Sequence, residues 1–233
     1  MSFFEVTQSL LGGFALTCLI FLFTLIVAIP LGMVLSFGLM SKFKPLEKAL
    51  KVFVWIIRGI PLMLQIFMVY YLPGILNEGV NFWGTVDKWF YFKFHVSSGG
   101  AFIAVLISFI INYACYFAVI FKGGIEGISR GQNEAGQVLG MTKGQIFRHV
   151  ILFQVIKKIT PPMSNEIITL VKDTALANAI GVVETIRTAT NFASGFPPIF
   201  WPIFYSGVFY LLFVGVLTLL FGYLEKKMSF YKE

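Results

Sequence analysis

Polar side chains recur at helical spacing inside three long apolar stretches of this sequence. In one stretch, a helix would place on a single face Glu166, Thr169, Asp173 and Ala177. In a second, the same spacing aligns Ser108, Asn112 and Tyr116. In the third, Arg58 and Gln65 flank Pro61, which leaves a backbone carbonyl without its helical partner. The polar side chains on these three stretches can form ion pairs and hydrogen bonds. Three polar helix faces predict a shared hydrated cavity.

The composition shows why polar residues at these positions are informative. Of 233 residues, 58% are hydrophobic and 12% are charged, with a mean hydropathy of +0.84. Soluble domains average about 25% charged residues, so this chain is suited to a lipid environment. A charge at the bilayer centre costs roughly 2.5–3.5 kcal/mol on insertion scales, so charged residues inside apolar stretches are candidates for function. We expect residues 1–233 to form one membrane-embedded domain.

The apolar stretches predict the elements that position these residues. A helix needs about 20 mainly apolar residues to cross the hydrocarbon core. Five stretches meet this length: 14–40, 52–72, 101–121, 163–183 and 200–224. The fourth is the most polar of them. The sequence therefore predicts an all-α integral membrane protein with five transmembrane helices.

The basic residues predict the orientation of these helices. Most of the 18 Lys and Arg residues fall in three segments, 41–51, 122–158 and 225–233, while the opposite side keeps only Lys88, Lys93 and Arg187. Because cytoplasmic loops carry the excess of Lys and Arg, the N-terminus is predicted outside and the C-terminus in the cytoplasm. The net charge of +7 then follows from topology, and no nucleic-acid partner is expected.

An aromatic cluster stands in the predicted outer loop, between residues 73 and 100. Its members are Trp83, Trp89, Phe90, Tyr91 and Phe92. Such residues are typical of the interface between membrane and water, and we expect them on a short surface helix. We favour this interpretation over an aromatic cage for a ligand.

The most polar cytoplasmic segment reads NEAGQVLGMTKGQIFRHVIL, residues 133–152. A short helix over 132–139 is predicted to close at Gly140 in the left-handed conformation. Thr142, with Gln145 three residues later, forms a capping-box pattern that opens a second helix, which Pro161 and Pro162 should end.

The short helix presents a small apolar face. Its members are Ala135, Val138 and Leu139, with Met141 just beyond. This face is too small to anchor firmly in lipid, but it fits a groove on a partner protein. A plain amphipathic surface helix is the alternative.

The same segment carries a family resemblance. Glu134-Ala135-Gly136, then Gly140, then Val150-Ile151-Leu152 resemble the Glu-Ala-Ala loop of the membrane subunits of ATP-binding-cassette importers. The blocks RGIPLMLQIFMVYYLPG, NYACYFAVIFKGGIEGISRGQ and NEIITLVKDTALANAIGVVE are similar to the polar amino acid permeases of that class. Gly136 replaces the usual Ala, which is expected to loosen the short helix by up to about 1 kcal/mol.

The resemblance implies a type I permease subunit of a bacterial cytoplasmic-membrane importer, with residues 130–152 as its coupling helix. Its partners would be ATP-binding-cassette ATPase subunits, an extracytoplasmic amino acid-binding protein and a second permease subunit, identical or paralogous. Without a GxxxxGK[ST] loop, this chain is not expected to hold ATP in that way or to be an enzyme. The implied ATPase-coupling residues are Glu134, Ala135, Gly136, Leu139, Gly140 and Met141.

An amino acid substrate would give the intramembrane residues distinct roles. Asp173 pairs with the ammonium, and Arg58 is a candidate partner of the carboxylate or a gating or docking residue. The predicted substrate path comprises Asp173, Asn112, Gln65, Thr174, Arg58 and Glu166. The alternative is that these groups connect helices, with Lys172 and Asp173 packing two permease copies together.

Two other protein classes remain alternatives. An ion-coupled secondary transporter would use the same carboxylates as proton or sodium sites, but such proteins usually contain two internally related halves, and no repeat is evident here. A membrane scaffold would leave the polar faces unexplained. No catalytic group, metal site or cofactor is predicted, because His95 and His149 stand alone and Cys18 and Cys115 lie in apolar runs.

Overall fold

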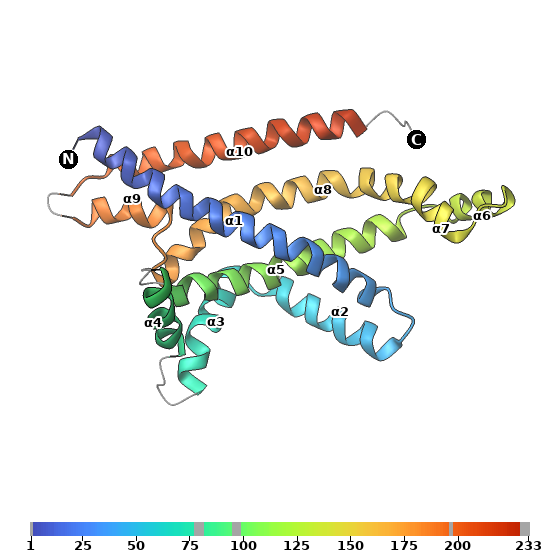
Figure 1. Cartoon of the computed structure of the whole chain (residues 1–233), viewed down its shortest axis with the longest axis horizontal. Coiled ribbons are helices and arrows are strands. Elements are labelled where there is room, and N and C mark those ends of the chain that lie inside the picture. Colours follow the sequence, from blue (N-terminus) through green and yellow to red (C-terminus); the bar gives the residue numbers. More distant parts are fainter. Residues whose placement is uncertain (1, 77–81, 95–98, 196–197, 229–233) are drawn as a thin grey trace.

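The computed structural model describes residues 2–76, 82–94, 99–195 and 198–228, with the backbone alone at 90–94. These residues form helices and connecting turns, without a strand among them (Figure 1). The α-helices are α1 (Phe3–Leu39), α2 (Lys44–Gly59), α3 (Leu62–Leu76), α4 (Phe82–Phe94), α5 (Gly99–Glu126), α6 (Arg130–Val138), α7 (Lys143–Ile146), α8 (Leu152–Asp173), α9 (Thr185–Ala193) and α10 (Trp201–Met228). A π-helical turn, η1 (Phe147–Ile151), precedes α8, and a 3₁₀ helix, η2 (Thr174–Ile180), follows it.

The long helices α1, α5, α8 and α10 run along the length of the molecule (Figure 1). Helix α5 lies at the centre of the packing, against α1, α3 and α8, and it buries Phe109, Tyr113 and Phe117. Gly32 of α1 allows the close approach to α5, since a Cβ there would lie 2.8 Å from the Cβ of Phe117. Small residues at such contacts are the usual means of packing helices tightly in lipid.

The number of membrane spans agrees only in part with the five predicted. Within the described ranges, three helices are long and apolar enough to cross a membrane, α1, α5 and α10, and a fourth span is counted if α2 and α3 form one broken span. The predicted span over 163–183 does not reach this standard, because α8 carries Lys157, Lys158, Glu166, Lys172 and Asp173. Its regular helix also ends at Asp173, and the 3₁₀ helix that follows closes at Gly181 in the left-handed region.

The predicted single helix over 52–72 is also wrong. Helices α2 and α3 meet at 103° across Ile60 and Pro61. Pro61 has no N–H and disfavours a helical residue before it, and Ile60 is accordingly extended, with φ −95° and ψ 131°. Gln65 compensates for the break, because its Nε2 donates to the carbonyls of Ile57 at 2.7 Å and Ile60 at 2.8 Å.

Pro161 and Pro162 do not end a helix, contrary to expectation, and both lie inside α8. Proline is tolerated in membrane helices when neighbouring helices and hydroxyl groups satisfy the freed backbone. Here α8 packs against α5 and α10, and the hydroxyls of Thr160 and Ser164 donate to the carbonyls of Ile156 and Thr160, which flank the carbonyls of Lys157 and Lys158 that the two prolines leave without a helical donor.

The aromatic cluster before α5 is only partly interfacial. Trp89 is exposed, but Trp83 is buried, and its indole N–H donates to the Tyr70 carbonyl at 2.8 Å. Trp83 therefore fastens α4 to α3 instead of anchoring at the membrane surface. The side chains of Phe90, Tyr91 and Phe92 lie outside the described residues, as does all of His95.

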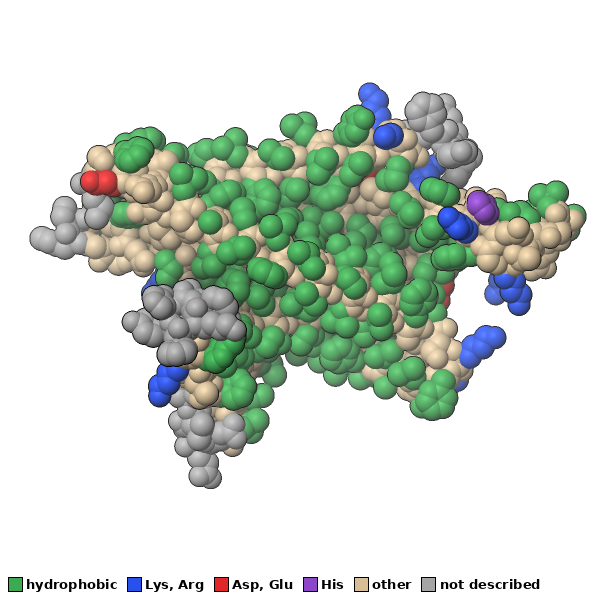
Figure 2. All heavy atoms as spheres, in the orientation of Figure 1, with side chains coloured by type: hydrophobic (Ala, Val, Ile, Leu, Met, Phe, Trp, Pro, Cys, Tyr) green, Lys and Arg blue, Asp and Glu red, His purple; other side chains and the backbone are tan. Residues whose placement is uncertain are grey.

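The predicted basic segments gather at one end of the molecule, which we call the basic end. The last turns of α1, α5 and α10 and the first turn of α2 all lie there (Figure 1). Figure 2 shows hydrophobic side chains over the middle of the bundle and most of the Lys and Arg side chains at this end. Helices α6 and α7 extend beyond it.

Candidate functional site

The break between α2 and α3 opens a cavity of about 480 Å³ against α5 and α8, which we call the inner cavity. It is lined by Arg58, Gly59, Ile60, Pro61, Leu62, Asn112, Tyr113, Tyr116, Glu166, Thr169 and Asp173. The predicted polar faces of three separate stretches therefore meet around one space. Pro61 itself lines the cavity, at the 103° bend between α2 and α3.

The wall of the inner cavity formed by α8 is acidic. Asp173 and Glu166 lie two turns apart on one face of the helix, with Thr169 between them. Tyr113, which is only 2% exposed, donates its hydroxyl to Asp173 Oδ2 at 2.7 Å. This bond fixes one carboxylate oxygen in place. Asn112 is 5% exposed and lines the cavity, where its amide can hydrogen-bond a bound solute.

Arg58 lies at the opposite edge of the inner cavity. The guanidinium carbon of Arg58 lies 4.7 Å from the centre of the Tyr116 ring, a cation–π contact. The ion pairs found among the described residues lie elsewhere, so Arg58 faces the cavity without a carboxylate within 4 Å. The cavity thus has an acidic wall and a cationic edge.

Two of the six predicted path residues lie outside the cavity lining. Gln65 is buried, and its amide N–H groups are used by the carbonyls at the helix break. Thr174 is fully buried, and its hydroxyl donates to the Val171 carbonyl at 2.6 Å. The structure therefore brings together Asp173, Asn112, Arg58 and Glu166, and gives Gln65 and Thr174 contacts within the fold.

A buried carboxylate that the sequence reasoning did not single out lies elsewhere in the bundle. Glu184 has no exposed surface, and its two oxygens accept from the backbone N–H groups of Ile186 at 2.7 Å and Arg187 at 2.8 Å. The Tyr210 hydroxyl of α10 donates to the same carboxylate at 3.0 Å. Glu184 therefore caps α9 and joins it to α10. The sequence feature that could have identified Glu184 is its position directly after the apolar run Gly181-Val182-Val183.

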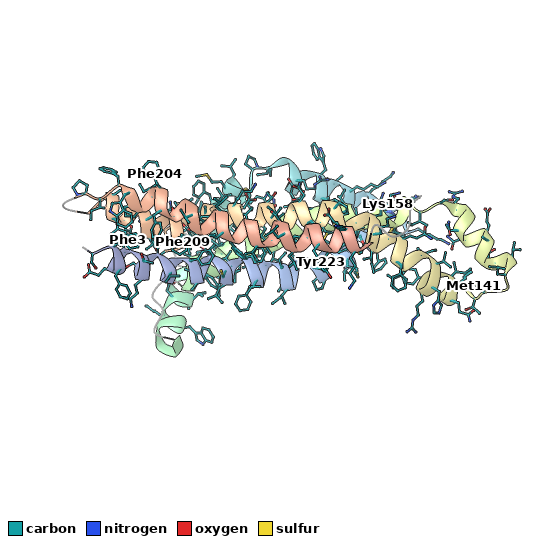
Figure 3. The ribbon with its side chains drawn as sticks, turned by 90° about the horizontal axis from the view of Figure 1, so that it is seen from above. Phe3, Met141, Lys158, Phe204, Phe209 and Tyr223 are labelled. Atoms are coloured by element: carbon teal, nitrogen blue, oxygen red, sulfur yellow. The ribbon has the colours of Figure 1, made fainter. Side chains whose placement is uncertain are left out.

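The second candidate site is the segment of α6 and α7. The predicted short helix is present as α6, Gly140 is left-handed with φ 73°, and Thr142 and Gln145 form the predicted capping box. Figure 3 shows Met141 near the far tip of this segment, opposite the end that carries Phe3 and Phe204. The predicted short helix, left-handed Gly140 and capping box are confirmed, whereas the second helix continues through the π-helical turn η1 into α8.

Hydrogen bonds join the α6–α7 segment and the turn before it to α8, and the segment exposes apolar side chains. Lys158, where α8 enters the bundle (Figure 3), donates to the Gly127 carbonyl at 2.8 Å, and Gln154 Nε2 donates to Gln132 Oε1 at 3.2 Å. At the end of α6, Val138 is 88% exposed and Leu139 is 78% exposed. Glu134 and Ala135 are exposed as well, while Met141 is half-buried.

Gly136 has a packing role that its helix propensity does not reveal. It is the one buried residue of α6, and a Cβ there would lie 2.6 Å from Cγ1 and 2.9 Å from Cδ1 of Ile146. Ile146 is itself only 1% exposed. Gly136 therefore makes room for the Ile146 side chain, which holds α6 against α7. This packing offsets the loosening of α6 that is expected from the low helix propensity of glycine.

Apolar helices around a cavity lined by opposite charges define a polytopic membrane protein. Residues 28–230 match the family described as the binding-protein-dependent transport system inner membrane component. The chain belongs to this family.

Two similar proteins come from Bacillus subtilis (strain 168). The arginine transport system permease protein ArtQ is 30% identical over 222 residues, which are 94% of this chain and 92% of ArtQ. The L-cystine transport system permease protein TcyB is 35% identical over 174 residues, 75% of this chain and 64% of TcyB. A chain in the crystal structure of an amino acid ABC transporter with histidines superposes with a TM-score of 0.80 at 26% identity, covering 97% of this chain and 99% of that one.

Proposed function

We propose that the chain is a permease subunit of an ATP-driven importer of polar amino acids in a bacterial cytoplasmic membrane. The observation that carries the proposal is the inner cavity, where Glu166 and Asp173 face Arg58 across a space of about 480 Å³. An α-amino acid carries an ammonium and a carboxylate on neighbouring carbons, so it needs opposite charges on two sides of one small cavity. The similarity to ArtQ and TcyB, both named as transport permeases for amino acids, supports this substrate class.

The charges of the cavity predict how the substrate lies in it. The ammonium faces Asp173 and Glu166 on α8, and the carboxylate faces Arg58 at the helix break. Tyr113 keeps Asp173 oriented through the 2.7 Å hydrogen bond. Asn112, which lines the cavity, supplies neutral hydrogen bonds between the two charged ends. The chain binds and releases the solute and makes no covalent bond to it.

The α6–α7 segment is proposed to be the coupling helix, which docks into an ATPase subunit at the cytoplasmic face. Three observations support this role. The segment projects from the basic end, it exposes Val138 and Leu139 at its tip, and polar contacts tie its base to α5 and α8. A rigid projection transmits a push from its tip into the long helix α8. Closure of two ATPase subunits would in this way move two permease subunits between outward-facing and inward-facing states.

The proposed topology keeps five crossings, with α8 as the polar one. Helix α8 has 22 residues, which is long enough to cross the hydrocarbon core, and α5 and α10 pack against it. Its side chains Glu166, Thr169 and Asp173 line the inner cavity, where the membrane cost of charge is avoided. The basic end is cytoplasmic, which places the N-terminus outside and the C-terminus inside. An extracytoplasmic binding protein would deliver the amino acid at the opposite end.

Uptake by the assembled transporter tests this function. The tagged chain is purified from its native membrane with its bound partners, reconstituted into proteoliposomes, and supplied with a panel of radiolabelled amino acids, the binding protein and internal or external ATP. We expect ATP-dependent uptake that falls at least about ten-fold in Asp173→Asn, because a hydrogen-bonded charge at a binding site is worth enough for that factor.

Lys172→Gln is the matched control, because Lys172 is the neighbouring residue and is exposed outside the cavity lining. This variant should retain uptake. Uptake that follows an imposed proton or sodium gradient and ignores ATP would replace the proposal with the ion-coupled transporter. Equal uptake by Asp173→Asn and the parent would remove the inner cavity from the substrate path.

A further inference from the structure

A second cavity, also of about 480 Å³, lies between α2 and α5 on the side of the basic end, and we call it the outer cavity. Its lining includes Lys51, Trp55 and Arg58 of α2, and Tyr116, Val119 and Lys122 of α5. Neither the inner cavity nor the coupling segment accounts for it.

The inner and outer cavities adjoin through shared lining residues, and we call the two together the groove. On α5, Asn112, Tyr116, Val119 and Lys122 are spaced by three or four residues, so they lie on one face and lead from the inner cavity to the basic end. Arg58, Gly59 and Tyr116 line both cavities. The cation–π contact between Arg58 and Tyr116, at 4.7 Å, therefore stands at the junction.

The two cavities carry opposite charges. The inner cavity has the carboxylates of Glu166 and Asp173, and the outer cavity has the ammonium groups of Lys51 and Lys122. Each lysine also pairs with a glutamate on its own helix, Lys51 with Glu47 at 2.7 Å and Lys122 with Glu126 at 2.8 Å. A zwitterion that leaves the inner cavity with its carboxylate leading would meet Arg58 first and the two lysines next.

The junction also has room for movement. Gly59 is the third residue shared by both cavities, and a Cβ built on it would meet nothing within 4 Å. Arg58 is exposed, and among the residues that the structure describes no carboxylate lies within 4 Å of its guanidinium. The Tyr116 ring is its partner across the groove. The guanidinium can thus exchange the ring for an anion without breaking an ion pair.

We propose that the Arg58–Tyr116 pair is the inner gate of the translocation path, closed when stacked and open when Arg58 leaves the ring for the carboxylate of the solute. The proposal rests on the proposed function only in naming the solute. The division of one groove into two cavities by this pair is a separate claim that requires no substrate.

Accessibility of the inner cavity from the basic end tests the gate. In a chain with Cys18→Ser and Cys115→Ala, Thr169→Cys places a thiol in the inner cavity, and the transporter is studied with its partners in inside-out membrane vesicles. The probe is a membrane-impermeant, anionic methanethiosulfonate reagent, and the labelling rate is read by mass spectrometry. Lys51→Cys in the same background reports on the outer cavity.

We expect Lys51→Cys to label fast and Thr169→Cys to label slowly while the pair is intact. Tyr116→Ala should speed labelling of Thr169→Cys about ten-fold, in line with the strength of a cation–π contact shielded from water. Tyr116→Phe keeps the ring and should keep labelling slow, as should Val119→Ala, a truncation one turn along the same face. Arg58→Gln should speed labelling as Tyr116→Ala does, and it serves alone if Tyr116→Ala does not assemble.

Fast labelling of Thr169→Cys with the pair intact would overturn the gate, and so would an unlabelled Lys51→Cys. Tyr116→Phe labelling as fast as Tyr116→Ala, or neither Tyr116→Ala nor Arg58→Gln changing the rate, would do the same. Failure of the proposed function has a different signature. In that case the labelling rates still depend on the pair, while no amino acid is taken up in an ATP-dependent manner.

Discussion

Gly136→Ala should destabilise the α6–α7 segment, although alanine is the better helix former. The intrinsic preference for Ala over Gly inside a helix favours the variant by about 1 kcal/mol. The new methyl group, however, would lie 2.6 Å from Cγ1 and 2.9 Å from Cδ1 of Ile146, which is buried and has little freedom to move. Overpacking a tight contact typically costs about 1–3 kcal/mol. The net expectation is a loss of up to about 2 kcal/mol, confined to this segment.

The measurement is hydrogen exchange of the backbone amides of residues 130–146, read by mass spectrometry on the purified transporter. Gly136→Ala should raise exchange there and leave α5 and α10 unchanged. Gly144→Ala is the matched control in α7, because a Cβ at that glycine meets nothing within 4 Å. Recovery of the ATPase with the tagged chain should fall in Gly136→Ala and be retained in Gly144→Ala.

A double substitution isolates the contact. Ile146→Ala removes the three atoms that the new methyl group would meet, at a cost of about 2–5 kcal/mol for emptying a buried site. Gly136→Ala combined with Ile146→Ala should then cost less than the two single changes together, because the added methyl fills part of the space. Slower exchange in Gly136→Ala, or strict additivity in the double variant, would refute the packing role of Gly136.

Two further changes probe contacts within the bundle. Gln65→Leu leaves the carbonyls of Ile57 and Ile60 without their side-chain donor, so we expect the free energy of unfolding, measured by thermal unfolding, to fall by about 1–3 kcal/mol. Met63→Leu, an exposed position in the same helix, should change it little. An unaltered melting temperature in Gln65→Leu would contradict this role of Gln65. Glu184→Ala removes the acceptor for two backbone N–H groups and for Tyr210, so it should lower the free energy of unfolding by at least about 2 kcal/mol. Tyr210→Phe removes only one of these hydrogen bonds and should lower it less. Equal losses in the two variants would show that the cap of α9 contributes nothing to stability.

The sequence predicted the candidate sites best where a local rule determines the conformation. The left-handed Gly140 and the Thr142–Gln145 capping box involve residues within a few positions of one another, so no distant contact was needed to predict them. Helical periodicity likewise placed Glu166, Asp173 and Asn112 on faces that meet at the inner cavity.

The prediction of path residues failed where the backbone leaves the α-helix. Beyond Asp173 the chain tightens into a 3₁₀ helix, and Thr174 turns inward to its own backbone. At Ile60 and Pro61 the chain turns by 103°, and Gln65 is used by the turn itself. Tyr113 was overlooked because it lies one position away from the polar line of α5. Its partner, Asp173, is 60 residues distant in sequence.

The sharp bend between α2 and α3 would allow α2 to rotate as a rigid helix about Ile60. At 1.5 Å per residue, the 16 residues of α2 reach about 24 Å, so a rotation of about 10° at the bend would carry the Lys44 end through about 4 Å. Helix α3, packed on α5, need not follow. A small rotation at Ile60 would therefore widen the groove most at the Lys44 end of α2. The hydrogen bonds from Gln65 to the carbonyls of Ile57 and Ile60 would limit that rotation.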